Sequence, residues 1–274
     1  MRWYDLKMDK LKEDIVGLLV ESEPLFKKAG EFLLKIRQKT KIKNKYNTGI
    51  RGVDIVTEAD LEVQEMILSE LAKTRLADCQ LIAEEDTPSI AKFNGTNGLV
   101  LTLDPIDGTI LYASNKRFFS VIVCLHDTKS MLYSFNHYPV LQWSRRITFN
   151  KIKDFGHLPE VQIKPGVNLN KTISHTFGNP QKAAPELYEK ITNMGYEFKL
   201  VSEITDESGS CTLFYLDEVP GYYTENPGAY DGLCALHFAQ AKKYKIYSTL
   251  DISKPLLSPR GFYYPGYYVA LKKP

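Results

Sequence analysis

Apolar residues recur at helical spacing along the first forty residues of the chain. This periodicity predicts helical structure over residues 10–38. Pro24 lies inside the segment, and because proline has no backbone N–H we expect a kink or a break there. The apolar positions that share the stripe are Leu11, Ile15, Leu18, Leu19, Phe26, Leu33 and Ile36.

A second helical pattern follows a polar loop. The loop covers residues 40–52, with Asn47-Thr48-Gly49 as its turn signal. After it, Val63, Ile67 and Leu71 form one apolar stripe. Asp60 stands before this stripe, where its carboxylate can cap the helix.

The rest of the chain alternates between strand and helix patterns. Short apolar runs predict strands over residues 80–83, 99–103, 119–125 and 131–137, with a turn over 94–98. The second half mixes helices over 185–194 and 231–243 with strands over 198–201 and 212–216. The alternating, tyrosine-rich tail over 266–271 is typical of an amphipathic edge strand. Interleaved helices and strands favour a layered α/β or α+β fold, and the Gly-, Pro- and Lys-rich stretch 152–170 is the best candidate for a junction.

Composition places few further limits on this picture. The chain has 274 residues, of which 43% are hydrophobic and 25% charged, as in soluble globular proteins. The formal net charge of +2 creates no strong field that attracts nucleic acid or acidic lipid. No run approaches the roughly 18 apolar residues of a membrane span, and the N-terminus does not read as a signal peptide. We therefore expect a cytoplasmic protein that binds neither nucleic acid nor membrane.

Basic residues, cysteines and histidines carry weaker signals. Six Lys and Arg residues between Lys35 and Lys45 form either a solvated helix end and loop or a region that attracts an anionic substrate. The four cysteines contain no CxxC pair, so we expect buried thiols rather than disulfides or zinc ligands. The five histidines lack metal-ligand spacing and are interpreted as surface or packing residues.

The candidate chemistry lies in the segment Leu103-Asp104-Pro105-Ile106-Asp107-Gly108-Thr109. Pro105 cannot donate to a sheet and Gly108 permits a sharp turn, so we expect the strand to stop at Asp104. Asp104 and Asp107 can then point into one small volume, where two anions repel each other. A hard divalent cation, Mg²⁺ or Mn²⁺, is the simplest compensation. The alternative is an ordinary turn at the end of a strand.

Three other segments place acidic residues at the ends of predicted elements. Glu84 begins the cluster Glu84-Glu85-Asp86 after the strand over 80–83, and the alternative for it is a solvated acidic turn. Asp60 and Asp231 each precede a helical pattern, where a carboxylate can also serve as a simple N-cap.

These four segments together resemble the inositol monophosphatase family of Mg²⁺-dependent, lithium-sensitive phosphatases. Asp104-Pro105-Ile106-Asp107-Gly108-Thr109 is similar to the central signature of that family. Residues 54–60 resemble its D-x-V-T-x-x-D segment, Ala83-Glu84-Glu85-Asp86 its G-E-E-S segment, and Tyr230-Asp231 with Cys234-Ala235 its W-D-x-x-A segment. All four occur in the family order.

The sequence also departs from the family pattern. Ile110-Leu111-Tyr112 stands where the family has Thr-Asn-Phe, Ala83 replaces a glycine, and Tyr230 replaces a tryptophan. The lysine expected shortly before Asp54 is not in register, and Lys45 and Arg51 are the alternatives. The resemblance therefore covers the metal site better than the part of the protein that recognises the substrate.

The resemblance implies a role for each matching residue. Glu84, Asp104 and the carbonyl of Ile106 would hold one Mg²⁺, and Asp104, Asp107 and Asp231 a second, within a set of two or three ions. Thr109 and Asp60 would orient the attacking water, with help from Glu84. The substrate-binding residues would be Gly108, Thr109, Gly209, Ser210 and Glu225, although a plain turn explains residues 208–211 nearly as well.

The resemblance further implies a layered αβαβα sandwich, the sugar-phosphatase fold. An N-terminal α+β half over residues 1–145 would carry most metal ligands, and a C-terminal α/β half over 146–274 would complete the site. We expect a homodimeric phosphomonoesterase whose substrate is a small phosphorylated polyol or sugar, with inositol monophosphate the first candidate. The alternatives are a 3′(2′),5′-bisphosphate nucleotidase, a fructose-1,6-bisphosphatase, or a divergent member that binds ligands without catalysis.

Overall fold

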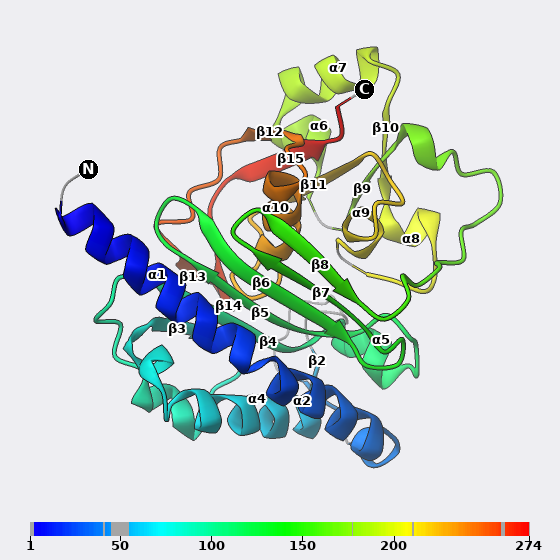
Figure 1. The fold of residues 1–274 in the computed structure, drawn as a ribbon. Coiled ribbons are helices and arrows are strands. Elements are labelled where there is room, and N and C mark those ends of the chain that lie inside the picture. The colour runs from blue at the N-terminus through cyan, green and yellow to red at the C-terminus, as the bar shows by residue number, and fades with distance from the viewer. Residues whose placement is uncertain are drawn as a thin grey trace.

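Two large sheets alternate with three layers of helices in the computed structural model (Figure 1). The structure describes residues 3–40, 42–44, 55–176, 178–209, 211–258 and 261–273, and for residues 3–7, 42–44 and 55–57 only the backbone. Ser210, Asp54, Lys45, Arg51 and the expected turn at 47–49 lie outside the described residues.

The N-terminal sheet has six strands in the order β3-β4-β5-β6-β7-β8. The first two strands are parallel and every other pair is antiparallel. The strands are β3 (Gln80–Ala83), β4 (Val100–Asp107), β5 (Ser120–His126), β6 (Met131–Tyr138), β7 (Trp143–Thr148) and β8 (Lys151–Phe155). The sheet thus extends to Phe155, and the division of the chain at residue 145 stays a prediction.

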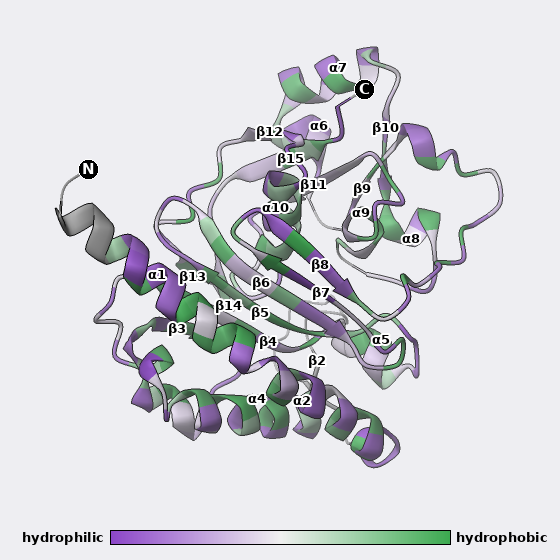
Figure 2. Ribbon diagram, viewed as in Figure 1, coloured by the Kyte–Doolittle hydropathy of each residue, from purple (hydrophilic) through white to green (hydrophobic). Residues whose placement is uncertain are grey.

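Three helices cover one face of this sheet, namely α1 (Trp3–Glu21), α2 (Glu23–Ile36) and α4 (Glu58–Leu71). Both hydrophilic and hydrophobic positions appear along α2 and α4 in Figure 2, and their apolar residues join the core beneath them. The break at Ser22, with Pro24 in the first turn of α2, confirms the expected interruption. Helix α4 begins at Glu58, so Asp60 lies inside the first turn and the expectation that it precedes the helix was wrong.

The C-terminal sheet has five strands in the order β10-β9-β11-β15-β12. The strands β10, β9 and β11 are parallel, whereas β15 runs antiparallel to β11 and β12. Their bounds are β9 (Thr172–His175), β10 (Glu197–Leu200), β11 (Gly221–Glu225), β12 (Lys245–Ser248) and β15 (Tyr267–Leu271). The expected edge position of the tail strand was wrong, because β12 pairs along its outer side.

A middle layer of helices separates the two sheets. Helices α9 (Thr212–Tyr215) and α10 (Leu233–Ala241) share one core with Ile122 of β5 and Tyr222 of β11. Residues 212–216 were expected as a strand, and this was wrong, because the apolar run instead forms a single helical turn against α10. On the far side of the C-terminal sheet lie α6 (Pro180–Ala183) and α7 (Pro185–Asn193), which gives the expected αβαβα order.

The remaining elements are short. They are β1 (Ile42–Asn44), β2 (Ile55–Thr57), α5 (Thr109–Ala113), α8 (Val201–Ile204), β13 (Leu256–Ser258) and β14 (Gly261–Tyr263). The strands β1 and β2 pair with each other, so the region expected as a loop over 40–52 contains a strand. Among the described residues, no helix is long and apolar enough to span a membrane.

Candidate active site

An extra residue in β4 places Asp104 and Asp107 on one face of the sheet. Asp104 of β4 pairs with Ile122 of β5, and Asp107 of β4 pairs with Ser120 of β5. An advance of three residues along β4 therefore matches an advance of two residues along β5. Residues three apart on a regular strand point to opposite faces, and the bulge restores the same face. That face is the one on which Ile122 joins the core shared with α10.

This bulge also corrects the expected end of the strand. Pro105 was expected to stop the strand at Asp104, but pairing resumes at Asp107. A proline is tolerated there because the bulge leaves a ladder position without a donor. The Ile106 N–H donates to Oδ1 of Asp104 over 2.9 Å, which fixes that carboxylate against its own backbone.

Glu84 lies directly beside Asp104. Strand β3 runs parallel to β4 with Ala83 opposite Leu103, and the Glu84 N–H donates to the Leu103 carbonyl over 3.2 Å. The carboxyl groups of Glu84 and Asp104 share a hydrogen bond, which contributes to a raised pKa of Asp104. Such a bond requires that one of the two carboxyl groups carries a proton.

Asp231 reaches the cluster from the turn that leads into α10. The hairpin of β13 and β14 holds this turn: the Ala229 N–H donates to the Phe262 carbonyl over 3.0 Å, and the Phe262 N–H donates to the Tyr230 hydroxyl over 2.7 Å. Gly228 contacts the carboxylate closely, because a methyl group added there would lie 2.4 Å from Oδ1 of Asp231. The turn therefore needs a glycine at this position.

Burial and mutual repulsion raise the pKa values of the carboxyl groups in this cluster. Burial raises the pKa of Asp104 well above its usual range, and the charges of Glu84, Asp107 and Asp231 add to the effect. The pKa of Asp107 rises to about 7 through burial and the charge of Asp231, against a hydrogen bond from Ser120. Burial raises the pKa of Asp231 to about 6. Asp104, Asp107 and Asp231 thus lie in a volume that disfavours their charged forms, and Glu84 contributes to the effect on Asp104.

The donor type of this cluster fits a hard divalent cation. Glu84, Asp104, Asp107 and Asp231 offer only oxygen atoms, which is the ligand set that Mg²⁺ and Mn²⁺ prefer. A cation also compensates the repulsion that raises the pKa values. In the structure, no group of three His, Cys, Asp or Glu residues within the described ranges is arranged to hold a metal ion. Binding a cation therefore requires the carboxylates to turn toward a common point.

The other residues assigned to the site come from α4 and from the turn into α5. Asp60 is buried in the first turn of α4. The pKa of Tyr112 in α5 is raised, mainly by burial, and the negative charge of Asp60 raises this pKa further. The Thr109 hydroxyl donates to the Ile106 carbonyl over 3.1 Å, and the expected pair of Thr109 with Asp60 stays a prediction. Gly108 has φ +81°, so the turn into α5 adopts the left-handed conformation that favours glycine.

Glu225 ends β11, and Gly209 lies in the segment between α8 and α9. Oε2 of Glu225, at the end of β11, accepts hydrogen bonds from the Asn179 N–H at 3.3 Å and from the Tyr223 hydroxyl at 3.1 Å. A methyl group on Gly209 would lie 3.7 Å from Cδ1 of Leu111 in α5. Their assignment to substrate binding stays a prediction.

Several contacts at the site were not anticipated from the sequence. Ser120 donates to Oδ2 of Asp107 over 3.3 Å, and only knowledge of the bulge would have placed it there. The thiols of Cys211 and Cys234 lie 3.4 Å apart, although 22 residues separate them in the chain. Arg37 belongs to the basic region that was expected either to be solvated or to attract an anionic substrate, and it donates to the carbonyls of Leu111 and Tyr112 in α5. All four cysteines are free and buried, as expected.

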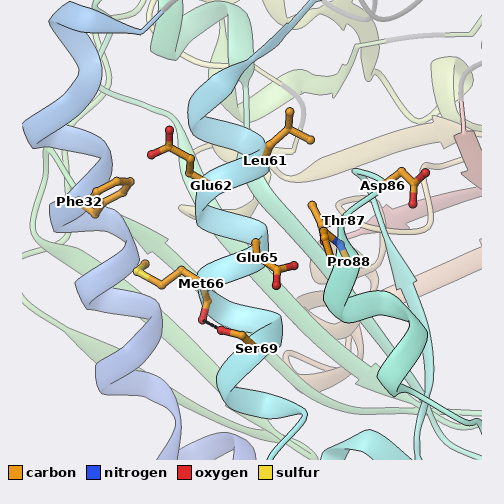
Figure 3. Close-up of a pocket in the computed structure, with 9 residues that line it drawn as sticks. All are labelled: Phe32, Leu61, Glu62, Glu65, Met66, Ser69, Asp86, Thr87 and Pro88. Carbon is orange, nitrogen blue, oxygen red and sulfur yellow. Dashed lines mark hydrogen bonds between the residues drawn. The ribbon is translucent and has the colours of Figure 1, made fainter.

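The described part of the chain also contains a groove beside α4 and a smaller pocket near β9 and β10. A groove of about 550 Å³ opens between α2 and α4, with side chains of α4 and of the segment 86–88 on its walls (Figure 3). None of the carboxylates assigned to the metal lines it. A smaller pocket of about 270 Å³, lined partly by Gly209, lies at the carboxyl ends of β9 and β10.

Comparisons with known proteins agree with this architecture. A stretch of 98 residues is 37% identical to mouse inositol monophosphatase 2, and one of 79 residues is 40% identical to the rat protein. The first match covers 36% of this chain and 32% of the mouse protein, and the second covers 29% of this chain and 26% of the rat protein, so the matched stretch spans a third or less of the length of these relatives.

Solved structures match over nearly the whole chain. The suhB protein of Bartonella henselae superimposes with a TM-score of 0.64 at 15% identity and covers 94% of both chains. The IMPase TM1415 of Thermotoga maritima gives a TM-score of 0.61 at 19% identity, over 93% of this chain and 92% of that one. At such identities these matches show the fold alone. The model of the inositol monophosphatase family matches residues 18–165, more than half of the chain, and the chain therefore belongs to the inositol monophosphatase family.

Proposed function

We propose that the protein is a Mg²⁺-dependent phosphomonoesterase that acts on a small phosphorylated polyol or sugar. The observation that carries this proposal is the cluster of Glu84, Asp104, Asp107 and Asp231, which three separate segments bring together and of which Asp104 is buried. Phosphoryl transfer needs charge stabilisation more than a protein nucleophile, and such a cluster can hold the cations that provide it.

The proposal assigns each residue the task that the family resemblance implies. Glu84, Asp104, Asp107, Asp231 and the Ile106 carbonyl would hold the cations, which when bound neutralise phosphoryl charge and make water more acidic. Glu84 accepts a proton from the attacking water, while Thr109 and Asp60 orient that water. Direct attack by water follows, without a phosphoenzyme.

Two related structures support a monophosphate substrate. Structures of a Staphylococcus aureus IMPase-II that share this fold hold inositol monophosphate in one case and 2′-AMP in another. Both match about 94% of this chain, with TM-scores of 0.58 and 0.59. A homodimer and a cytoplasmic location stay predictions.

The test is phosphate release from a panel of esters with and without Mg²⁺. The panel contains inositol 1-phosphate, glycerol 2-phosphate, fructose 1,6-bisphosphate, adenosine 3′,5′-bisphosphate and NADP. We expect release that depends on Mg²⁺ and falls at least about 1,000-fold in Asp104→Asn. Equal release by wild type and variant would contradict the proposal.

A second candidate is a protein that binds phosphorylated ligands without catalysis. It is favoured by Leu111 and Tyr230, which stand in place of the family residues. Against it, every proposed ligand carboxylate is present, although buried carboxylates without a cation destabilise a protein. Ligand binding without release from any ester would favour this candidate.

A further inference from the structure

Arg37 connects the end of α2 to the short helix α5. It follows Ile36, the last residue of α2, and its guanidinium donates hydrogen bonds to three backbone carbonyls. Nε donates to the Tyr112 carbonyl over 2.7 Å, and Nη2 donates to the carbonyls of Leu111 and Lys116 over 2.9 and 2.7 Å. The guanidinium therefore binds α5 and the turn after it, at least 74 residues away in the chain.

Helix α5 depends on partners outside itself because it has only five residues. A helix this short is unstable alone in water, and its last carbonyl groups have no partner within the helix. Leu111 and Tyr112 lie at its end, where a basic side chain that binds carbonyl groups stabilises a helix. A charged donor also makes stronger hydrogen bonds than a neutral one. Arg37 is thus well suited to hold the end of α5 in place.

The side chain of Tyr112 strengthens the same connection. The guanidinium of Arg37 lies 5.1 Å from the ring centre of Tyr112 and 4.7 Å from that of Phe119, distances at which a cation is attracted to an aromatic ring. The Tyr112 hydroxyl donates to the Leu33 carbonyl of α2 over 3.2 Å and lies 3.1 Å from the hydroxyl of Thr40. Tyr112 stands where the family resemblance places a phenylalanine, so the bond from this hydroxyl to α2 is a departure of this chain.

The first turn of α5 connects these contacts to Thr109. The N–H groups of Leu111 and Tyr112 both donate to the Gly108 carbonyl, over 2.8 and 3.0 Å. Thr109 lies within this turn, and its hydroxyl donates to the Ile106 carbonyl over 3.1 Å. Because five residues make little more than one helical turn, a displacement of the end of α5 also displaces Thr109.

We propose that Arg37 is a positioning residue of the active site: by holding the end of α5, it fixes the Thr109 hydroxyl where that hydroxyl orients the attacking water. The proposal rests on the phosphatase function proposed above and adds a residue to it. On this proposal Arg37 neither lies free in solvent nor attracts an anionic substrate, the two interpretations that the sequence left open for the basic region.

The test is a double-mutant cycle that separates kcat from KM. Phosphate release is measured on the panel ester that the wild type hydrolyses fastest, for wild type, Arg37→Met, Thr109→Ala and the double variant. Methionine keeps an apolar stem and removes every donor. We expect kcat to fall at least about 10-fold in Arg37→Met with little change in KM, because a displacement of about 1 Å can cost about 100-fold in rate. In the Thr109→Ala background the same change should lower kcat less than about 2-fold, because the group that Arg37 positions is absent.

Two further variants separate position from charge. Arg37→Lys keeps the charge, but one ammonium group does not span three carbonyls, so kcat should still fall at least about 3-fold. Lys28→Met is the matched control, because it removes the same charge from an exposed position on α2, and it should leave kcat and KM unchanged. Wild-type kcat in both Arg37 variants, a raised KM alone, or an equal loss of kcat with and without Thr109 would overturn the proposal.

The position of α5 is also measured without turnover. Hydrogen exchange of the Tyr112 amide, followed by NMR, should be at least about 10-fold faster in Arg37→Met than in wild type, because hydrogen bonds from a charged donor are lost. Lys28→Met and the amides of β5 should keep the wild-type rate. No release from any ester by the wild type would contradict the phosphatase itself. Hydrogen exchange then decides whether Arg37 holds α5: faster exchange supports it, and equal exchange overturns it.

Discussion

The bulge between Asp104 and Asp107 shows what residue-scale reasoning can reach. The sequence predicted that both carboxylates share one volume, and the pKa effects between them agree. The predicted cause was a strand that stops, whereas the structure has a strand that continues with one extra residue. A sequence pattern does not reveal such a bulge, because it depends on pairing with Ser120 and Ile122 of the next strand. The hydrogen bond from Ser120 to Asp107 could not be predicted from the sequence for the same reason.

Replacing Asp104 should stabilise the protein in the absence of divalent cations. Asp104→Asn keeps an oxygen for the Ile106 N–H and removes a charge that is buried beside three carboxyl groups. We expect the free energy of unfolding in chelator at pH 8 to rise by about 1 kcal/mol or more. Urea unfolding measures it, with Asp9→Asn on the exposed face of α1 as the control. A variant less stable than wild type in chelator would contradict the repulsion inferred for the cluster.

Gly228 is the second residue whose replacement is informative. The Cβ of Gly228→Ala would lie 2.4 Å from Oδ1 of Asp231, so the carboxylate must move. We expect the affinity for Mn²⁺, measured by calorimetry, to fall at least about 10-fold, as for other changes that misplace a metal ligand. Gly17→Ala in α1 is the matched control, because nothing lies within 4 Å of the added methyl group. Equal affinities in the two variants would show that Asp231 does not bind the metal.

At the scale of elements, the long periodic segments were predicted well and the short ones were not. The break between α1 and α2 and most strand positions follow from apolar spacing and Pro24. The strand predicted over residues 212–216 was wrong because an apolar run of five residues fits a buried strand and a buried helical turn equally well. The predicted edge position of the tail strand was wrong because its outer partner β12, Lys245–Ser248, shows no strong apolar pattern and was not predicted as a strand.

Helix α10 carries a buried histidine that should make stability depend on pH. Nε2 of His237 donates to the Phe149 carbonyl over 2.6 Å and Nδ1 accepts from the Ser134 hydroxyl over 2.9 Å, which suits the neutral ring. Burial lowers the pKa of His237 to about 4, from 6.5. The unfolded chain therefore binds the proton first, and stability is lost as the pH falls from about 6.5 toward 4.

The loss from His237 alone should reach about 3 kcal/mol at pH 4. His237→Gln removes this titration, so the free energy of unfolding should fall less steeply between pH 6.5 and 4 than in wild type. Urea unfolding across this range measures the slope. His157→Gln, at an exposed position, should keep the wild-type slope. A wild-type slope in His237→Gln would show that His237 is not buried in its neutral form.

At the scale of the whole molecule, the site joins elements that are distant in the chain. Glu84, Asp104 and Asp107 come from neighbouring strands of the N-terminal sheet, and Asp231 comes from the turn before α10, between the two sheets. Apolar spacing alone predicted a layered fold, but it did not predict that these four acidic residues lie close together. The order of four acidic motifs implied it through the family resemblance.

The most direct test of the carboxylate cluster is a calorimetric titration of the chelator-treated protein with Mg²⁺. Wild type should bind Mg²⁺ with a measurable heat, and Asp104→Asn and Asp231→Asn should each bind at least about 10-fold more weakly, because each variant loses one of the proposed ligands. The control Asp9→Asn should bind as wild type does. Equal binding by all four proteins, or no binding by wild type, would contradict a metal site formed by these residues.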